Sequence, residues 1–443
     1  MGALLVTSGT VITLGPTNRV LPGHDVLVED GTVRRIVPHG EIAGFTGRSI
    51  DAAGKVVMPG FINAHMHFYS TLVRGLGKAA PSASFQEVLE HLWWRLDRKL
   101  ELEDCFVSAL VAGIDAIRHG TTTLIDHHAS PFAVRSSLDA IARVVQEVGL
   151  RASLCYELSD RDGAGVAQDG IDENVAFIER CAREDDPHLR ALFGLHAAFT
   201  LGDATLARAA EAGARLGAGF HVHVAEAASD QEANLRDHGL RVVERLHRFG
   251  VLGPRSIAAH CVHVDAREIE LLAETGTAVV HNPQSNMNNA VGVADVPRML
   301  AAGVLVGLGT DAMTTNMLEE VRAALWVRHL AAGNPSAGFV GTLSTLLVNN
   351  PTIAGRYWPG LGLGALVEGG AADLVLLDYH PPTPLDEGTF LGHLAFGISQ
   401  AVVDTTIVGG RVLMEGRKLL LDLDEAEVAA KSRELAARLW ERF

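Results

Sequence analysis

The alternation of apolar and polar positions divides the chain into two ends that resemble each other and a middle that differs. Near the N-terminus, residues 26–31 and 33–37 alternate apolar and polar side chains around Asp30-Gly31, a pair typical of hairpin turns. Residues 373–377 and 405–413 near the other end show the same pattern. We therefore expect β-sheet at both ends of the chain, in residues 1–57 and 366–443, with a helix at the C-terminus.

The middle of the chain, residues 58–365, alternates short apolar runs with amphipathic or alanine-rich segments. Eight runs qualify as strands: 56–67, 121–128, 151–158, 190–199, 219–226, 256–264, 278–286 and 305–311. Helices are expected between them, for example at 132–148, 204–216, 230–249 and 265–274. This order predicts a parallel (β/α)8 barrel, with a doubly wound open sheet as the competing arrangement.

Composition and charge narrow the class of protein. With 443 residues and 48% hydrophobic content, the chain can form a large core. No run reaches the roughly 18 apolar residues of a membrane span, and the first residues lack the features of a signal peptide. The formal net charge of −16 argues against a nucleic acid or an anionic membrane as partner. We expect a cytoplasmic protein that acts on a small molecule.

The numbers of cysteine, lysine and histidine residues in the sequence are informative. The four cysteines form no C-x-x-C pair, so they are expected to be buried small side chains rather than disulfides or a zinc knuckle. Lysine is rare, and none occurs between Lys99 and Lys418. Histidine, by contrast, occurs 20 times.

The histidines gather where the predicted strands end, which is where chemistry collects in a barrel. His65 and His67 are two residues apart, a spacing that puts both imidazoles on one side of a strand. The fifth run carries His221 and His223, the sixth His260 and His263, and the eighth ends at Asp311. Imidazoles with one carboxylate suit zinc or ferrous iron, so the pattern predicts a metal site.

The motifs around these residues resemble those of the amidohydrolase superfamily. They are 59–67 (PGFINAHMH), 223–226 (HVAE), 281–286 (HNPQSN) and 308–311 (LGTD). They are most similar to the cytosine deaminase and chlorohydrolase-like branch. Further stretches, 67–70, 92–98, 125–131 and 285–289, resemble a subgroup of aminohydrolases found with selenium-metabolism genes. The resemblance covers essentially the whole chain and implies a small β-sandwich domain built from both chain ends beside the barrel.

The resemblance implies a ligand set of His65, His67, His223 and Asp311 for one divalent ion per chain, zinc or alternatively iron(II). Physical reasoning agrees, because three imidazoles and one carboxylate leave the ion enough charge to bring the pKa of a bound water near 7. Asp311 can also accept a hydrogen bond from that water.

The same resemblance assigns catalytic roles to Glu226 as proton carrier, to His260 in preference to His263, and to Asp311. It suggests a substrate contact for His196. His128 and Trp94 are further candidates for substrate binding, although buried structural roles are equally open for the histidines at 127 and 128, and His221 is expected to be a hydrogen-bonded strand residue. The chain departs from the branch at 312–316 (AMTTN), a loop that helps to shape the pocket.

The predicted function is deamination: a metal-bound hydroxide attacks a C–N bond of a small heterocycle of purine, pyrimidine or pterin type, and ammonia leaves. One alternative is a chloride or N-alkyl leaving group on a triazine, although the proton carrier Glu226 favours an amine. Another is a metal-dependent binding protein without catalysis. A two-metal cyclic amidase is disfavoured because it needs a bridging lysine in the barrel. The resemblance also suggests a homo-oligomer, most simply a dimer.

Overall fold

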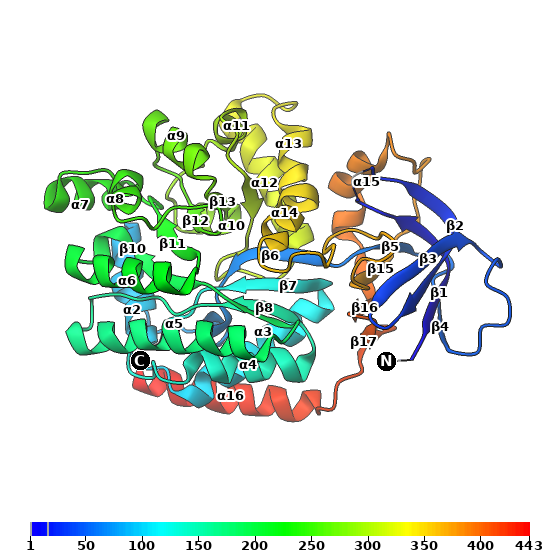
Figure 1. The fold of residues 1–443 in the computed structure, drawn as a ribbon, viewed down its shortest axis with the longest axis horizontal. Coiled ribbons are helices and arrows are strands. Elements are labelled where there is room, and N and C mark those ends of the chain that lie inside the picture. The colour runs from blue at the N-terminus through cyan, green and yellow to red at the C-terminus, as the bar shows by residue number, and fades with distance from the viewer. Residues whose placement is uncertain (1, 16) are drawn as a thin grey trace.

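The computed structural model describes residues 2–15 and 17–443, and its strands form three sheets. One sheet is built from both ends of the chain and lies at one side of the molecule (Figure 1). Its strands are β1 (Leu4–Ile12), β2 (Val20–Glu29), β3 (Thr32–Pro38), β4 (Arg48–Asp51), β5 (Val56–Pro59), β15 (Leu374–Asp378), β16 (Val402–Val408), β17 (Arg411–Glu415) and β18 (Lys418–Leu419).

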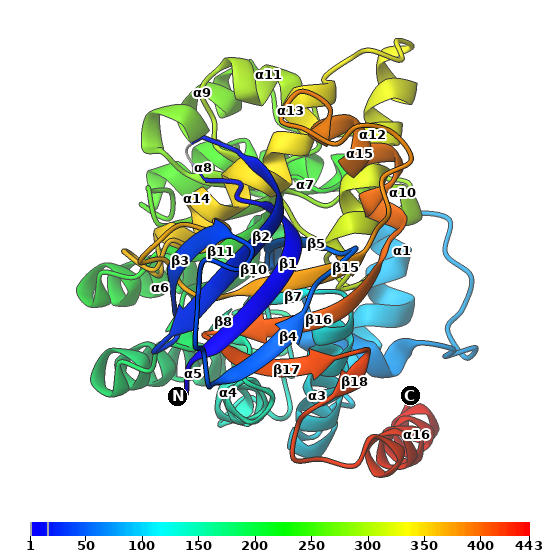
Figure 2. The same cartoon turned by 90° about the vertical axis from the view of Figure 1, so that its right-hand side faces the viewer.

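This terminal sheet has nine strands in the order β18-β17-β16-β15-β5-β1-β2-β3, and β4 pairs with β1. Strand β5 from the N-terminal part pairs antiparallel with β15 from the C-terminal part, which joins the two ends of the chain. Seen from its own side, the sheet covers one end of the molecule (Figure 2). The prediction that both ends form sheet is correct. The predicted β-sandwich is not confirmed, because hydrogen bonds link the described strands into one continuous sheet.

The middle of the chain forms two parallel sheets. The first contains β6 (Phe61–Met66), β7 (Thr121–Asp126), β8 (Arg151–Leu154) and β9 (Leu189–Ala191). The second contains β10 (Phe193–Ala197), β11 (Phe220–Val224), β12 (Ile257–His260), β13 (Ala278–His281) and β14 (Val306–Leu308). Each of the eight predicted apolar runs holds a strand. The strand order of an open, doubly wound sheet, which was the competing prediction, is not observed among the described strands.

The two parallel sheets meet at both of their edges. The fourth predicted run is divided: β9 pairs with β8, whereas β10 pairs with β11, so this run belongs to both sheets. At the other edge, a parallel bridge joins Met66 to Asp311, next to β6 and β14. No continuous ladder of hydrogen bonds closes the described strands into a barrel. The structure therefore shows a mixed α/β fold with parallel sheets, and closure of these sheets into the predicted (β/α)8 barrel is not confirmed.

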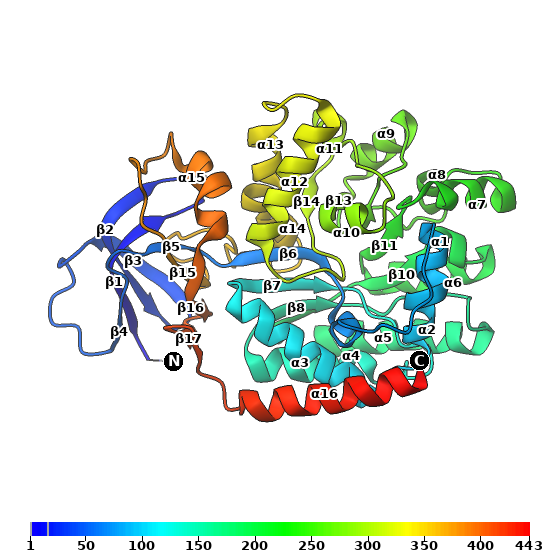
Figure 3. The ribbon, with the colours of Figure 1, turned by 180° about the vertical axis from the view of Figure 1, so that it is seen from behind.

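Helices surround the parallel sheets (Figures 1 and 3). They are α1 (Phe85–Val88), α2 (Trp94–Asp97), α3 (Leu102–Arg118), α4 (Ser137–Val148), α5 (Ala164–Glu184), α6 (Asp203–Leu216), α7 (Ala228–His238), α8 (Val242–Arg248), α9 (Ala266–Thr275), α10 (Pro283–Asn288), α11 (Val296–Ala301), α12 (Met317–Ala332), α13 (Phe339–Ser344), α14 (Asn350–Gly355), α15 (Phe390–Phe396) and α16 (Glu425–Arg442). Short 3-10 helices are η1 (Phe68–Val73), η3 (Ala198–Thr200) and η5 (Ile398–Gln400), and π-helical turns are η2 (Leu89–Trp93) and η4 (Thr345–Asn349).

The positions of the helices follow from the spacing of apolar residues along the sequence. In α4, Leu138, Ile141 and Val145 recur at helical spacing and are buried, which directs this face to the core. The predicted helix 230–249 is instead two helices, α7 and α8. Gly239 ends the first of them in the left-handed region, at φ +67°, where glycine is strongly preferred.

Two long-range contacts fix the chain ends to the middle. Arg151 on β8 donates two hydrogen bonds to the buried carboxylate of Asp373, which precedes β15 and also accepts from the Gly409 N–H. Helix α16 runs along the helical layer, and its Trp440 donates to the Leu72 carbonyl (Figure 3). Among the described helices, none is both long and apolar enough to cross a membrane.

Candidate active site

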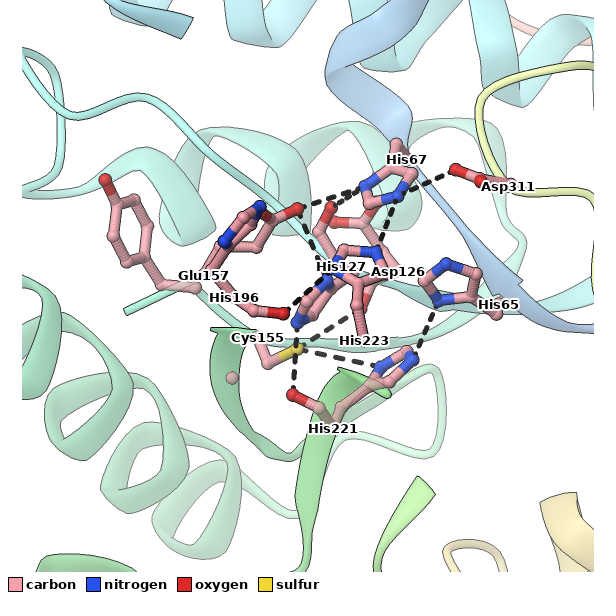
Figure 4. Close-up of polar contacts among 12 residues, drawn as sticks. His65, His67, Asp126, His127, Cys155, Glu157, His196, His221, His223 and Asp311 are labelled. Atoms are coloured by element: carbon pink, nitrogen blue, oxygen red, sulfur yellow. Dashed lines mark hydrogen bonds and ion pairs between the residues drawn. The ribbon is translucent and has the colours of Figure 1, made fainter. Parts of the chain in front are cut away.

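The predicted ligands converge where strands of both parallel sheets end. His65 lies on β6, His67 follows it, His223 lies on β11, and Asp311 follows β14 (Figure 4). The Nε2 atoms of His67 and His223 are 3.4 Å apart, and His67 Nε2 is 3.0 Å from Asp311 Oδ1. The Nε2 atom of His65 is buried and has no hydrogen-bond partner among the described residues. Unpaired buried nitrogens are costly, and a shared cation would satisfy all of these atoms.

The electrostatics of the cluster also favour a cation. Burial lowers the pKa of His65 and of His223 well below the ordinary histidine value, which leaves neutral imidazoles with a free lone pair. Burial also lowers the pKa of His67, but the hydrogen bonds and negative charges of Asp311 and Glu157 together outweigh burial, so the pKa is raised well above the ordinary histidine value. The pKa of Asp311 is depressed despite burial, because His67 faces it. The negative potential that favours a proton between His67 and Asp311 also favours a divalent cation there.

Each imidazole of the predicted ligand set has a contact at its Nδ1 atom that orients the ring. His67 Nδ1 faces the His127 carbonyl, and His223 Nδ1 donates to the His196 carbonyl at 2.9 Å. His65 Nδ1 lies 2.8 Å from Nε2 of His221 (Figure 4). Such partners fix the ring and the tautomer, so Nε2 is the atom left for a metal. His221 is thus the hydrogen-bonded strand residue that the sequence suggested.

A second group of residues, beside the predicted ligands, contains Glu226 and His260, for which the sequence predicts proton chemistry. His260 Nε2 lies 3.5 Å from Glu226 Oε2 and 3.6 Å from Asp311 Oδ2. Its Nδ1 is 2.8 Å from the side-chain oxygen of Asn286. Burial, together with the charges of Asp311 and Asp230, raises the pKa of Glu226 well above the usual range. A carboxyl group that binds a proton this readily is suited to general acid–base work.

The backbone at these strand ends is unusual. His260 and Asp311 adopt left-handed conformations, with φ of +70° and +54°. Side chains other than glycine rarely adopt this region, and strain of this kind is concentrated at functional sites. Gly309 approaches β6 so closely that a Cβ atom there would lie 2.7 Å from the His65 carbonyl oxygen. The geometry of the site therefore depends on this local close packing.

The cluster opens into a cavity that is accessible from its open side. Its walls combine aromatic, acidic and imidazole side chains: His67, Tyr69, Phe85, Leu89, Trp93, Trp94, Asp97, Glu157, His196, Phe199, His223, Glu226, Asp230, Asn289 and Asp311 among others. Among the described residues that line the cavity, none is an arginine or a lysine.

The three predicted substrate contacts lie in different environments. Trp94 at the start of α2 and His196 on β10 both line the cavity. His128 does not belong to the lining; it is fully buried, and its Nε2 is 2.9 Å from the Ser130 hydroxyl. Tyr69 lies against it, with ring centroids 5.7 Å apart. His263 is a loop residue whose Nε2 contacts the Val291 carbonyl.

Sequence reasoning missed two acidic residues on the cavity wall. Glu157 follows β8 and is buried, with its Oε1 3.2 Å from His127 Nδ1 and 3.3 Å from His67 Nδ1. Asp97 ends α2 and faces Arg161 at 3.4 Å. Glu157 could have been found, because it is a carboxylate at the end of the third apolar run. Asp97 lies on a helix, so the expectation that functional residues stand at the ends of strands did not identify it.

The chain is similar to several known proteins. A family model described as the amidohydrolase family matches residues 56–413. A 5-methylthioadenosine/S-adenosylhomocysteine deaminase from Pelotomaculum thermopropionicum is 34% identical, with 100% of each chain covered. A 5'-deoxyadenosine deaminase from Methanosarcina mazei is 32% identical over 99% of each chain. An adenosine deaminase structure from Xanthomonas campestris with bound zinc has a TM-score of 0.86 and 25% identity, covering 98% of each chain.

The chain therefore belongs to the amidohydrolase family, as its motifs predicted. Within that family it is a metal-dependent hydrolase that acts on C–N bonds of heterocycles, a deaminase, as predicted. A zinc-bound atrazine chlorohydrolase structure from Arthrobacter aurescens, at 22% identity and a TM-score of 0.81, covers 98% of this chain and 100% of its own, and it shares the fold. The narrower resemblance to the selenium-associated subgroup stays a prediction.

Proposed function

We propose that this enzyme deaminates an amino-substituted purine-like ring at the cavity described above, with His65, His67, His223 and Asp311 as ligands of one zinc ion. The observation that carries the proposal is the position of Glu226. Its carboxyl group lines the cavity, lies 3.5 Å from His260 Nε2 and has a raised pKa. Release of ammonia needs such a proton carrier, whereas release of chloride does not.

The donor set fits the ion, since three imidazole nitrogens and one carboxylate leave room for a further ligand. A bound divalent ion lowers the pKa of a water ligand towards neutrality and so supplies a nucleophile. Glu157 and His127 lie on the Nδ1 side of His67, so we assign them to orienting that ring rather than to a second ion. One ion per chain is the expected stoichiometry.

The chain's own residues then divide the proton work. Asp311 Oδ2, which accepts from the Ser285 hydroxyl, and His260 Nε2 face each other at 3.6 Å and hold the attacking water in place. Glu226 takes the water's proton and delivers it to the ring nitrogen beside the reacting carbon. The same carboxyl then takes the remaining proton of the hydroxyl that has been added to the ring carbon and carries it to the departing amine, so that ammonia leaves and a ring carbonyl is formed. His196 and Trp94, whose rings lie edge to face with centroids 6.5 Å apart in the cavity wall, contact the bound ring.

The names of the relatives make adenosine-type purines the first compounds to test. We extend the proposal to the architecture: the two parallel sheets, over residues 58–365, form one (β/α)8 barrel, with residues 1–57 and 366–443 as the second domain. Action in the cytoplasm and assembly as a homodimer complete the proposal.

The test is ammonia release from a panel of purines, pyrimidines, pterins and their nucleosides, measured with zinc-loaded enzyme. We expect turnover of at least one ring amine, and loss of it after chelation. A chlorotriazine and an N-alkylaminotriazine serve as the competing substrates. The proposal would be overturned if the enzyme released chloride or alkylamine from a triazine but released no ammonia from any compound of the panel.

A further inference from the structure

One wall of the cavity is a short, interrupted helical segment, residues 85–97, here called the wall segment. It consists of α1, the π-helical turn η2 and α2, and it lines the cavity with Phe85, Leu89, Trp93, Trp94 and Asp97. Helices shorter than ~12–15 residues are marginal by themselves and depend on packing against neighbouring elements. The π-helical turn divides this segment further, and such turns are frequent at functional sites. The shape of the wall segment therefore depends on what supports it from behind.

The end of α16 contacts the side of the wall segment that faces away from the cavity. In Figure 3 the end of α16 lies beside α2. Arg95 on α2, which is not among the residues that line the cavity, donates a hydrogen bond to the main-chain carbonyl of Phe443 at 2.6 Å. Its guanidinium also lies over the Phe443 ring, 4.1 Å from the ring centroid. A hydrogen bond and a cation–π contact thus join the wall segment to the residue that follows α16.

Two further residues of α16 hold the chain on both sides of the wall segment. The indole N–H of Trp440 donates to the Leu72 carbonyl at 2.8 Å, and the Trp440 carbonyl accepts from Lys78 Nζ at 2.7 Å. These contacts fix the chain that leads into α1. Arg442 donates to the Lys99 carbonyl at 3.1 Å, just after α2.

Apolar packing continues from α16 to the cavity. Leu435 and Leu439 are buried in one hydrophobic cluster with Tyr69, against which Trp93 and Trp440 also pack. The rings of Tyr69 and Trp93 meet edge to face, with centroids 6.3 Å apart, and both residues line the cavity. The aromatic side chains of the cavity therefore rest on the same apolar cluster as the inner face of α16.

We propose that α16 is a positioning element for the substrate, and that Trp440 and Phe443 are positioning residues that hold the wall segment where its aromatic side chains contact the substrate ring. The inference rests on the proposed function, because it takes this cavity as the substrate site. The hydrogen bonds and ion pairs of α16 reach none of the predicted metal ligands, nor Glu226 or His260. Loss of this support should therefore weaken substrate binding and leave the zinc site and the proton chemistry unchanged.

The first experiment measures kinetics on the compound of the ammonia panel that is deaminated most rapidly. Arg95→Met removes both contacts to Phe443, and Trp440→Ala removes the indole of α16. In each zinc-loaded variant we expect KM to rise at least ~5-fold while kcat stays within ~2-fold, the pattern of a lost interaction that is equal in the ground and transition states. Zinc should stay at one equivalent per chain.

The matched control is Lys431→Met on the same helix. Lys431 Nζ lies 2.9 Å from Glu103 on α3 and does not contact the wall segment. This variant should keep the wild-type KM. An unchanged KM in folded, zinc-loaded Arg95→Met would overturn the inference, and so would an equal rise of KM in Lys431→Met.

The second experiment needs no substrate. Hydrogen exchange of the main-chain amides of residues 85–97 should be at least ~10-fold faster in Arg95→Met and Trp440→Ala than in wild type, whereas the amides of α9 should keep their rates. If α16 only stabilised the whole molecule, Trp440→Ala would lower Tm and accelerate exchange in α9 as well, and the inference would be overturned. Absence of ammonia from every compound with wild type would instead remove the proposed function, and exchange in the wall segment would still decide whether α16 supports it.

Discussion

At the scale of single residues, the site depends on which nitrogen of each histidine is free. His67 and His223 use Nδ1 on main-chain carbonyls, and His65 uses Nδ1 on His221. The predicted ligand set came from residues at strand ends together with the resemblance of their motifs to the amidohydrolase superfamily, and the structure brings these residues together. The sequence could not predict the hydrogen-bond partners of these Nδ1 atoms, since the main-chain carbonyl groups of residues 127 and 196 are present whatever the side chain is.

Removal of one ligand, His65→Ala, should abolish tight zinc binding because a quarter of the protein ligands is lost. His221→Phe keeps all ligands but removes the contact to His65 Nδ1, so zinc affinity should fall ~10–100-fold. His263→Ala, on a loop, is the control. Competition with a chromophoric chelator measures each affinity. Wild-type affinity in both His65→Ala and His221→Phe would refute this description of the site.

At the scale of elements, the apolar runs predicted where strands occur but not how they pair. The first run is divided between β5 in the terminal sheet and β6 in a parallel sheet, and the fourth between β9 and β10. Hydrophobicity reports burial and not the identity of the neighbouring strand, so neither division is visible in the sequence. The close approach of Gly309 to β6 is likewise a property of the pairing.

A methyl group at residue 309 should disturb the ligands. In Gly309→Ala the new Cβ would meet Asn282 Oδ1 at 2.6 Å and the His65 carbonyl at 2.7 Å, so β6 must shift. We expect zinc occupancy and kcat to fall at least ~10-fold, since small misplacements at such sites are costly. Gly165→Ala, in exposed helix with no atom near the added Cβ, is the control. Equal occupancy in the two variants would argue against close packing as the determinant.

At the scale of the whole molecule, buried charges connect parts that are distant in the sequence. Arg151 and Asp373 join a parallel sheet to the terminal sheet. Glu320 on α12 accepts hydrogen bonds from the main-chain and side-chain nitrogens of Gln284 on α10. The sequence predicted that both chain ends form sheet. It could not predict one continuous sheet, because pairing between β5 and β15 depends on contacts across some three hundred residues.

Glu320 makes the stability of the fold depend on pH. Burial raises its pKa to about 8, whereas an unfolded glutamate titrates near ~4.3. The folded state therefore binds more protons between these values, and the free energy of unfolding falls as pH rises through this window. Glu320→Gln removes the effect. Urea unfolding should show the variant gaining at least ~1 kcal/mol relative to wild type between pH 5 and pH 8. An unchanged difference at the two pH values would contradict the raised pKa.

In the proposed mechanism, one metal site and the Glu226 carboxyl together release ammonia from a heterocycle. The most direct measurement is kcat for ammonia release by Glu226→Gln, with zinc determined on the same sample. Glutamine has the same shape but cannot carry a proton, so kcat should fall ~10²–10⁴-fold while zinc stays at one equivalent per chain. A fully loaded variant within ~3-fold of wild type would contradict the mechanism.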